Sequence, residues 1–165
     1  MRKILTVAMA SLVALGAQVA LATTRSDPND VTGGLDIKTS SVRKVEIADG
    51  VFRTRFVVTT YDPFDLSDGV GSFYWQVDSK GDGAADYEVY MFGDPKAVPA
   101  GPLFCLLRAT DHSGKVYGRV RQGDSSFLCG FPSRFVETTH DVRWRLAGRM
   151  EGIIDRAPDT GWYSS

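Results

Sequence analysis

The sequence predicts an all-β domain, a single β-sandwich or jelly roll of about eight antiparallel strands. Apolar and polar residues alternate with a period of two over most of the chain, as in "FYWQV" at 73–77, and this pattern is typical of strands with one buried face. Turn signals rich in Gly, Asp and Pro interrupt the alternation at short intervals. No useful helical period occurs beyond the N-terminal apolar run, and short strands at this spacing build sandwiches and jelly rolls.

The expected strands follow from the alternation and from the turns between them. In the second strand, Phe52 and Phe56 alternate with Arg53 and Arg55, and a turn sequence "ADG" precedes it. The same reasoning delimits the others. The eight expected strands are 35–47, 51–61, 72–78, 86–92, 103–109, 115–121, 126–131 and 141–149.

The N-terminus predicts export. Two basic residues are followed by an apolar run, which ends in the small-x-small sequence Ala20-Leu21-Ala22. This is the pattern of a secretory signal peptide at residues 1–22, cleaved after Ala22. Residues 23–34 are polar and end in glycine, so we expect a flexible lead-in. The β-sandwich domain is then 35–165, in a secreted protein.

The charge of the mature chain argues against nucleic acid as a partner. Without residues 1–22 the chain has 143 residues, with 17 basic and 20 acidic side chains and a net charge of −3. A negative chain has no global attraction to nucleic acid. No second long apolar run occurs, so we expect no stable membrane insertion after cleavage.

Two cysteines, Cys105 and Cys129, lie in the exported part. An even count in an oxidising compartment predicts a disulfide, which stabilises by roughly 3–4 kcal/mol for a loop of about 25 residues. A simple meander through 103–109, 115–121 and 126–131 would separate the cysteines by two strand spacings, about 10 Å. Bridged Cα atoms lie about 4.4–6.8 Å apart. We therefore keep the disulfide and place the cysteines either on adjacent strands or across the sandwich.

Residues 72–78 and 86–92 are predicted to form a hairpin with one favoured register. Pairing about Asp82 puts only apolar residues on one side, whereas a slip of one residue would mix the two sides. The apolar pairs are Val77 with Tyr87, Trp75 with Val89 and Phe73 with Met91; the outer pairs are Gln76 with Glu88 and Tyr74 with Tyr90.

The hairpin loop "DSKGDGAAD" contains candidate calcium ligands, Asp78, Asp82 and Asp86. An EF-hand is excluded because Lys80 and Val89 occupy two ligand positions. Three interpretations remain. The simplest is a tight turn, which commonly uses Asp and Gly. Alternatively, the Lys80 ammonium replaces an ion among the carboxylates, or the loop binds calcium weakly. We expect no cofactor, or weakly bound calcium.

Two segments, "FYWQVDSKGDGAADYEVYMF" and "DRAPDTGWY", resemble uncharacterised exported bacterial β-sandwich proteins. These in turn are similar to DOMON-like and carbohydrate-binding family nine modules. The resemblance implies a ligand-binding or structural sandwich without a defined substrate. In such proteins the hairpin more often has the pattern Asp-x-Asp-x-Asp-Gly, from which Lys80 departs.

The outer face of the hairpin is the first candidate ligand site. Tyr74 and Tyr90 are expected to stand opposite each other, with Gln76 and Glu88 beside them. Aromatic rings stack on sugar rings, and the two polar side chains can hydrogen-bond hydroxyl groups. Ordinary cross-strand packing of the tyrosines is the competing interpretation.

Arginines at period two suggest a possible basic patch. The three pairs are Arg53 with Arg55, Arg119 with Arg121, and Arg143 with Arg145. If their faces coincide they can hold an anionic polymer. The competing interpretation, which the intermixed acids favour, is a solvated face with cross-strand partners such as Glu46, Glu88 or Glu137.

No catalytic signature of a serine hydrolase, zinc protease, P-loop or dinucleotide enzyme occurs, and we expect no enzyme. The sequence predicts an exported non-catalytic binding module, with an extracellular carbohydrate or cell-envelope polymer as the candidate ligand. The alternative is a structural or protein-interaction sandwich without a small-molecule site.

Overall fold

The computed structural model describes residues 24–33, 35–94, 96, 101–136, 142–150 and 152–164. The predicted signal peptide, with its cleavage after Ala22, lies outside the described residues. Among those residues, no helix has the length and apolar character needed to cross a membrane.

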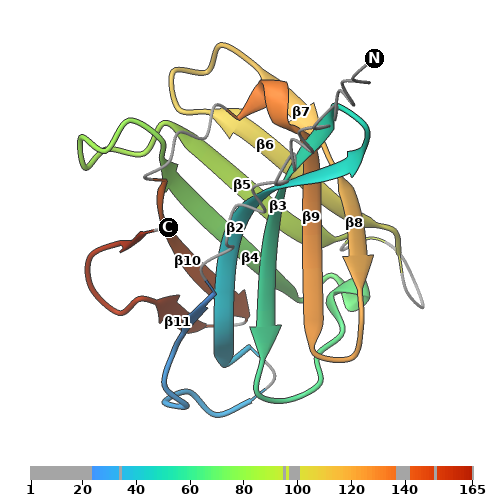
Figure 1. Ribbon diagram of the computed structural model, residues 1–165. Coiled ribbons are helices and arrows are strands. Elements are labelled where there is room, and N and C mark those ends of the chain that lie inside the picture. Colours follow the sequence, from blue (N-terminus) through green and yellow to red (C-terminus); the bar gives the residue numbers. More distant parts are fainter. Residues whose placement is uncertain are drawn as a thin grey trace, which may run out of the picture.

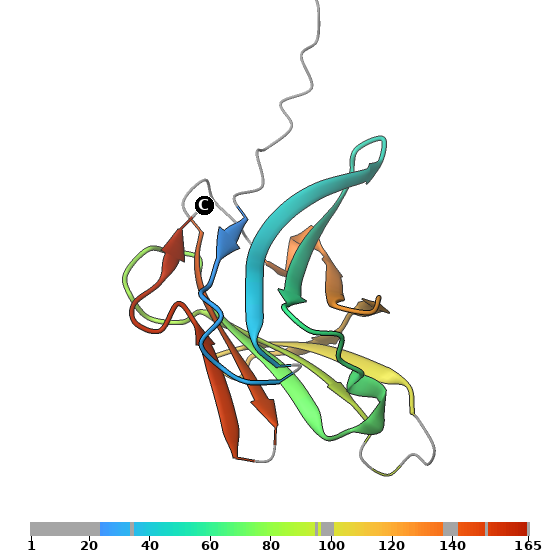
Figure 2. The ribbon, with the colours of Figure 1, turned by 90° about the horizontal axis from the view of Figure 1, so that it is seen from below.

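Two antiparallel sheets face each other and confirm the predicted β-sandwich (Figures 1 and 2). Sheet 1 has five strands in the order β1-β2-β3-β9-β8, and sheet 2 has seven, in the order β11-β10-β4-β5-β6-β7 with β12 paired to β10. The strands of sheet 1 are β1 Arg25–Ser26, β2 Ile37–Ala48, β3 Val51–Thr60, β8 Arg119–Gln122 and β9 Ser126–Pro132. Those of sheet 2 are β4 Gly71–Asp78, β5 Tyr87–Gly93, β6 Leu103–Ala109, β7 Lys115–Tyr117, β10 Arg143–Met150, β11 Ile153–Ala157 and β12 Tyr163–Ser164. Two 3₁₀ turns, η1 Leu66–Asp68 and η2 Ser133–Phe135, complete the elements.

Aromatic side chains from the inner faces of both sheets form the core. Phe56 of sheet 1 lies edge-on to Trp75 of sheet 2, with ring centroids 6.0 Å apart, and Phe127 packs against Phe73 at 5.1 Å. All four side chains are fully buried. Burying large aromatic rings is the main favourable contribution to folding here.

The β4–β5 hairpin has the predicted register. All five expected pairs occur, from Val77 opposite Tyr87 to Phe73 opposite Met91. Trp75 and Val89 are buried, while the tyrosines on the other side are partly exposed. The outer residues of β4 are therefore available to form a site.

The segment 115–121 was predicted as one strand, and this was wrong. Strand β7 pairs with β6 in sheet 2, and β8 pairs with β9 in sheet 1. The chain passes between the sheets at Gly118, where a Cβ would lie only 2.6 Å from the Phe131 ring. Because of this crossing, β6 pairs with β7 and β9 pairs with β8, and no strand separates Cys105 of β6 from Cys129 of β9.

The disulfide between Cys105 and Cys129 is confirmed. It joins β6 of sheet 2 to β9 of sheet 1, with Cα atoms 5.9 Å apart. Of the two placements left open, the cysteines therefore take the one across the sandwich.

Both ends of the domain are attached to the sheets, and this corrects the expected flexible lead-in at 23–34. Strand β1 pairs with β2, and Asp27 is buried. Tyr163 packs on Trp144 with ring centroids 5.9 Å apart. The folded domain therefore begins before residue 35. Strands β1, β11 and β12 are too short or too weakly patterned for the alternation to have predicted them.

Candidate functional site

A pocket of about 420 Å³ opens on the outer face of sheet 2. Its walls come from β4, β10, β11 and the loop before β12. Tyr74 and Gln76 of β4 line it together with Arg145, Leu146, Ala147 and Arg149 of β10, Arg156 of β11, and Pro158, Asp159 and Gly161 of the loop. Its volume is within the range of small-ligand sites.

Strand alternation brings the arginines into this pocket. Arg145 and Arg149 are exposed on β10, whereas Trp144 and Leu146 between and beside them are buried. The register places Arg145 opposite Gln76. On β11, Arg156 is exposed and its neighbour Asp155 is buried.

Uncharged groups contact two of these arginines. The Nε of Arg145 donates to Oε1 of Gln76 at 2.5 Å, and its guanidinium lies 4.7 Å from the centre of the Trp162 ring. Arg149 lies 5.9 Å from the centre of the Tyr74 ring. Within the described residues, the ion pairs closer than 4.0 Å are Lys80–Asp86 and Arg108–Glu88, so no described carboxylate neutralises the arginines of the pocket at that distance.

Beside the pocket, Tyr74, Tyr90, Glu88 and Arg108 form a closed hydrogen-bonded cluster. The two rings lie 4.8 Å apart. Tyr74 donates to Glu88 Oε1 at 2.6 Å and Tyr90 to Oε2 at 3.1 Å, while Arg108 donates to Oε2 from Nε at 3.1 Å and from Nη2 at 2.5 Å. Glu88 is therefore already engaged by three side chains.

The electrostatics of this cluster agree with that arrangement. Burial alone would raise the pKa of Glu88, but hydrogen bonds from Tyr74, Arg108 and Tyr90 outweigh it and lower the pKa. Burial and the Glu88 carboxylate raise the pKa of Tyr74. Of the four predicted ligand-binding residues, Tyr74 and Gln76 line the pocket, and Tyr90 and Glu88 support Tyr74 from the side.

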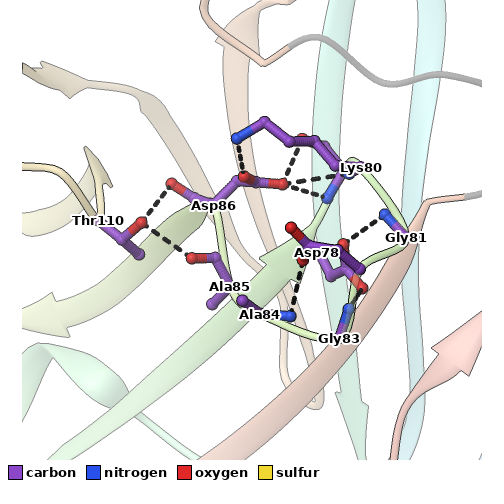
Figure 3. Close-up of polar contacts among 10 residues, drawn as sticks. Asp78, Lys80, Gly81, Gly83, Ala84, Ala85, Asp86 and Thr110 are labelled. Atoms are coloured by element: carbon purple, nitrogen blue, oxygen red, sulfur yellow. Dashed lines mark hydrogen bonds and ion pairs between the residues drawn. The ribbon is translucent and has the colours of Figure 1, made fainter.

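The predicted calcium loop is a turn whose carboxylates are occupied by the loop itself (Figure 3). Asp78 is fully buried and accepts the backbone N–H groups of Gly81 at 2.5 Å and Gly83 at 2.8 Å. Both glycines have positive φ, 76° and 89°, a conformation that other residues adopt at a cost. Asp82 accepts the N–H of Ala84 at 2.9 Å.

Lys80 engages the third carboxylate. Its Nζ forms an ion pair with Asp86, which also accepts the N–H and hydroxyl of Ser79 at 2.9 and 2.8 Å. Burial opposes ionisation of Asp86, but these hydrogen bonds and the Lys80 charge lower its pKa. This geometry favours a turn in which a lysine takes an ion's electrostatic role. Weak calcium binding by Asp78, Asp82 and Asp86 stays a prediction.

Two of the three arginine pairs come together on sheet 1. Arg53, Arg55, Arg119 and Arg121 line a groove of about 300 Å³ with Ile47, Leu128 and Gly130. Arg143 and Arg145 lie on β10 of the other sheet. Of the expected acidic partners, Glu46 accepts the N–H of Gly50, Glu88 holds Arg108, and Glu137 lies outside the described residues.

The sequence did not identify Arg149, Arg156 or Asp159 as site residues. Arg149 continues the period of two from Arg145 along β10, so extending that strand face would have found it. Arg156 and Asp159 come from a strand and a loop whose position beside β10 is set by tertiary structure, which leaves no local signal.

No protein-family model matches this sequence, and neither a curated protein nor a solved structure matches it. The function is therefore inferred from the chemistry of the residues that the fold brings together.

Proposed function

We propose that the protein is an exported, non-catalytic binding module for an acidic carbohydrate, held in the pocket beside Tyr74. The observation that carries the proposal is the set of three arginines in that pocket, which no described carboxylate neutralises within 4.0 Å. Export is supported by the sequence of residues 1–22. The resemblance to DOMON-like and carbohydrate-binding family nine modules stays a prediction.

The lining residues suit the parts of such a ligand. Guanidinium groups form paired, charge-assisted hydrogen bonds with carboxylate or phosphate groups. The Tyr74 ring offers an apolar surface with a polar rim, and the Gln76 amide can donate to a hydroxyl. The mature chain is negative overall, so we expect attraction of an anion to be local, at arginines such as those of this pocket or the sheet 1 groove, and not a property of the whole chain.

A binding assay with matched polysaccharides tests the proposal. We expect the protein to bind a polyuronate such as polygalacturonate, to bind neutral dextran far less, and to release the polyuronate as salt increases. Arg145→Ala should weaken binding tenfold or more, because it removes both a charge and the group that holds Gln76. Tyr74→Ala should also weaken it.

Arg55→Ala is the matched control, because Arg55 is an arginine on the opposite sheet. Loss of binding in Arg55→Ala but not in Arg145→Ala would move the site to the sheet 1 groove. No retention on any acidic or neutral polysaccharide would leave the alternative, a structural or protein-interaction sandwich.

A further inference from the structure

Three carboxylates gather where the start of the described chain meets its last long strand. Asp27 follows β1, Asp30 lies in the next loop, and Asp155 is in the middle of β11. Each offers one oxygen, and these oxygens all lie within 4.8 Å of one another. In Figures 1 and 2, the blue β1 segment lies beside the red C-terminal strands. The cluster thus joins two segments from opposite ends of the domain.

Two of the three side chains are almost completely buried. Asp27 is 5% exposed and Asp155 is 2% exposed. Asp155 Oδ2 accepts the backbone N–H of Ile37 at 2.5 Å, and Asp27 Oδ1 accepts the hydroxyl of Tyr163 at 2.9 Å. These hydrogen bonds fix both carboxylates in place before any ligand arrives.

Buried oxygens without hydrogen-bond donors are the second, independent observation. Oδ2 of Asp27 is buried and accepts no hydrogen bond from the described residues, and the same holds for Oδ1 of the neighbouring Asp36, which is 1% exposed. A buried carboxylate oxygen without a partner is costly in free energy. Native proteins rarely leave such groups unsatisfied, so the unpartnered oxygens point to a ligand.

No positively charged side chain of the described residues forms an ion pair with the cluster. Among the described residues, the ion pairs closer than 4.0 Å are Lys80–Asp86, in the β4–β5 loop, and Arg108–Glu88, between β6 and β5. The fold has concentrated negative charge here without pairing it to a described lysine or arginine.

We propose that Asp27, Asp30 and Asp155 bind one calcium ion, which connects the N-terminal segment to β11. Carboxylate oxygens within 4.8 Å of one another can share an ion that lies about 2.3–2.6 Å from each. The absence of histidine and cysteine from the trio disfavours zinc. Magnesium retains several waters in octahedral geometry, which two nearly buried carboxylates disfavour. None of the three aspartates lines the pocket beside Tyr74, and the calcium proposal does not depend on the proposed function.

Calorimetric titration of the exported, EDTA-treated protein with CaCl₂ tests the site. We expect one calcium per chain and a melting temperature that rises with calcium but much less with equal magnesium. Asp30→Asn should weaken calcium binding at least tenfold. Because Asp30 is exposed, this variant should fold like the original protein, which far-UV circular dichroism would verify.

Asp49→Asn is the matched control, because Asp49 is an exposed aspartate of the β2–β3 turn, outside both candidate calcium sites, and the change should leave calcium binding unchanged. The proposal is overturned if the unmodified protein neither binds calcium nor gains stability from it. It is also overturned if magnesium acts equally, or if Asp49→Asn abolishes binding while Asp30→Asn does not.

Discussion

The hairpin loop and the terminal aspartate cluster contain the same residue type in opposite situations. In the loop, Asp78 and Asp86 accept hydrogen bonds from nearby backbone groups, and Lys80 supplies a positive charge. In the cluster, Asp27 and Asp155 are buried beside each other, with no ion pair to a described lysine or arginine. The loop resembles a calcium motif in the sequence, but its own backbone N–H groups and Lys80 already engage its carboxylates. The cluster has no sequence motif, because its members come from distant segments. Its carboxylates nevertheless lack a described cationic partner, and it is there that we propose a calcium ion.

The largest expected effect comes from removing the buried carboxylate of the loop. Asp78→Ala leaves the N–H groups of Gly81 and Gly83 without their acceptor, so we expect a loss of about 2–3 kcal/mol in the free energy of unfolding. Urea denaturation measures it. The loss should be the same with calcium and with EDTA, because hydrogen bonds within the loop stabilise it and no ion is needed.

Asp78→Asn serves as the control, since its amide oxygen can still accept one of the two hydrogen bonds. It should lose less stability than Asp78→Ala. A loss in Asp78→Ala that occurs only in the presence of calcium would mean that the loop, too, binds the ion.

The next effect separates the two regions within one experiment. With calcium at about ten times its dissociation constant, local opening of the cluster should become about tenfold rarer. Amide hydrogen exchange should therefore slow at Asp27 and Ile37, whose N–H groups bond to Lys38 O and Asp155 Oδ2. The amides of Gly81 and Gly83 should not respond. Equal slowing of exchange in both regions would contradict the proposal that calcium binds at the terminal cluster and not at the hairpin loop.

The same contrast explains what the sequence could predict. The register of the β4–β5 hairpin followed from the alternation of side chains over a few residues, because a slip of one position would have exposed Trp75 and Val89. The disulfide followed from the predicted export of the chain and the even count of cysteines. These features depend on short stretches or on composition, which the sequence displays directly.

Features that depend on the arrangement of distant segments were missed. The crossing at Gly118 required knowing that Phe131 lies against it. Asp27 was placed in a flexible lead-in, because nothing near it in the sequence indicates that β11 will bury it. The pocket beside Tyr74 likewise needed β10 to pair with β4 and β11 to pair with β10. A single glycine or aspartate carries no local signal of such contacts.

The smallest expected effect tests whether Lys80 is what keeps an ion out of the loop. The Lys80 side chain is 72% exposed, whereas the Asp86 side chain is 12% exposed and keeps its hydrogen bonds from Ser79 without the lysine; an ion pair with so exposed a partner contributes little to stability. Lys80→Asp should therefore leave the melting temperature nearly unchanged, while placing a carboxylate at the third position of the loop, where calcium loops carry an oxygen ligand.

Calorimetric titration with calcium measures the effect, in the Asp30→Asn background so that binding at the terminal cluster is weakened and contributes as little as possible. With Lys80 present, we expect no calcium binding tighter than about millimolar, because its ammonium already neutralises Asp86. The Lys80→Asp change should strengthen binding measurably, since it removes that positive charge and adds an oxygen ligand. A micromolar constant before the change would show that the loop binds calcium despite its lysine, and the contrast between the two regions would then be lost.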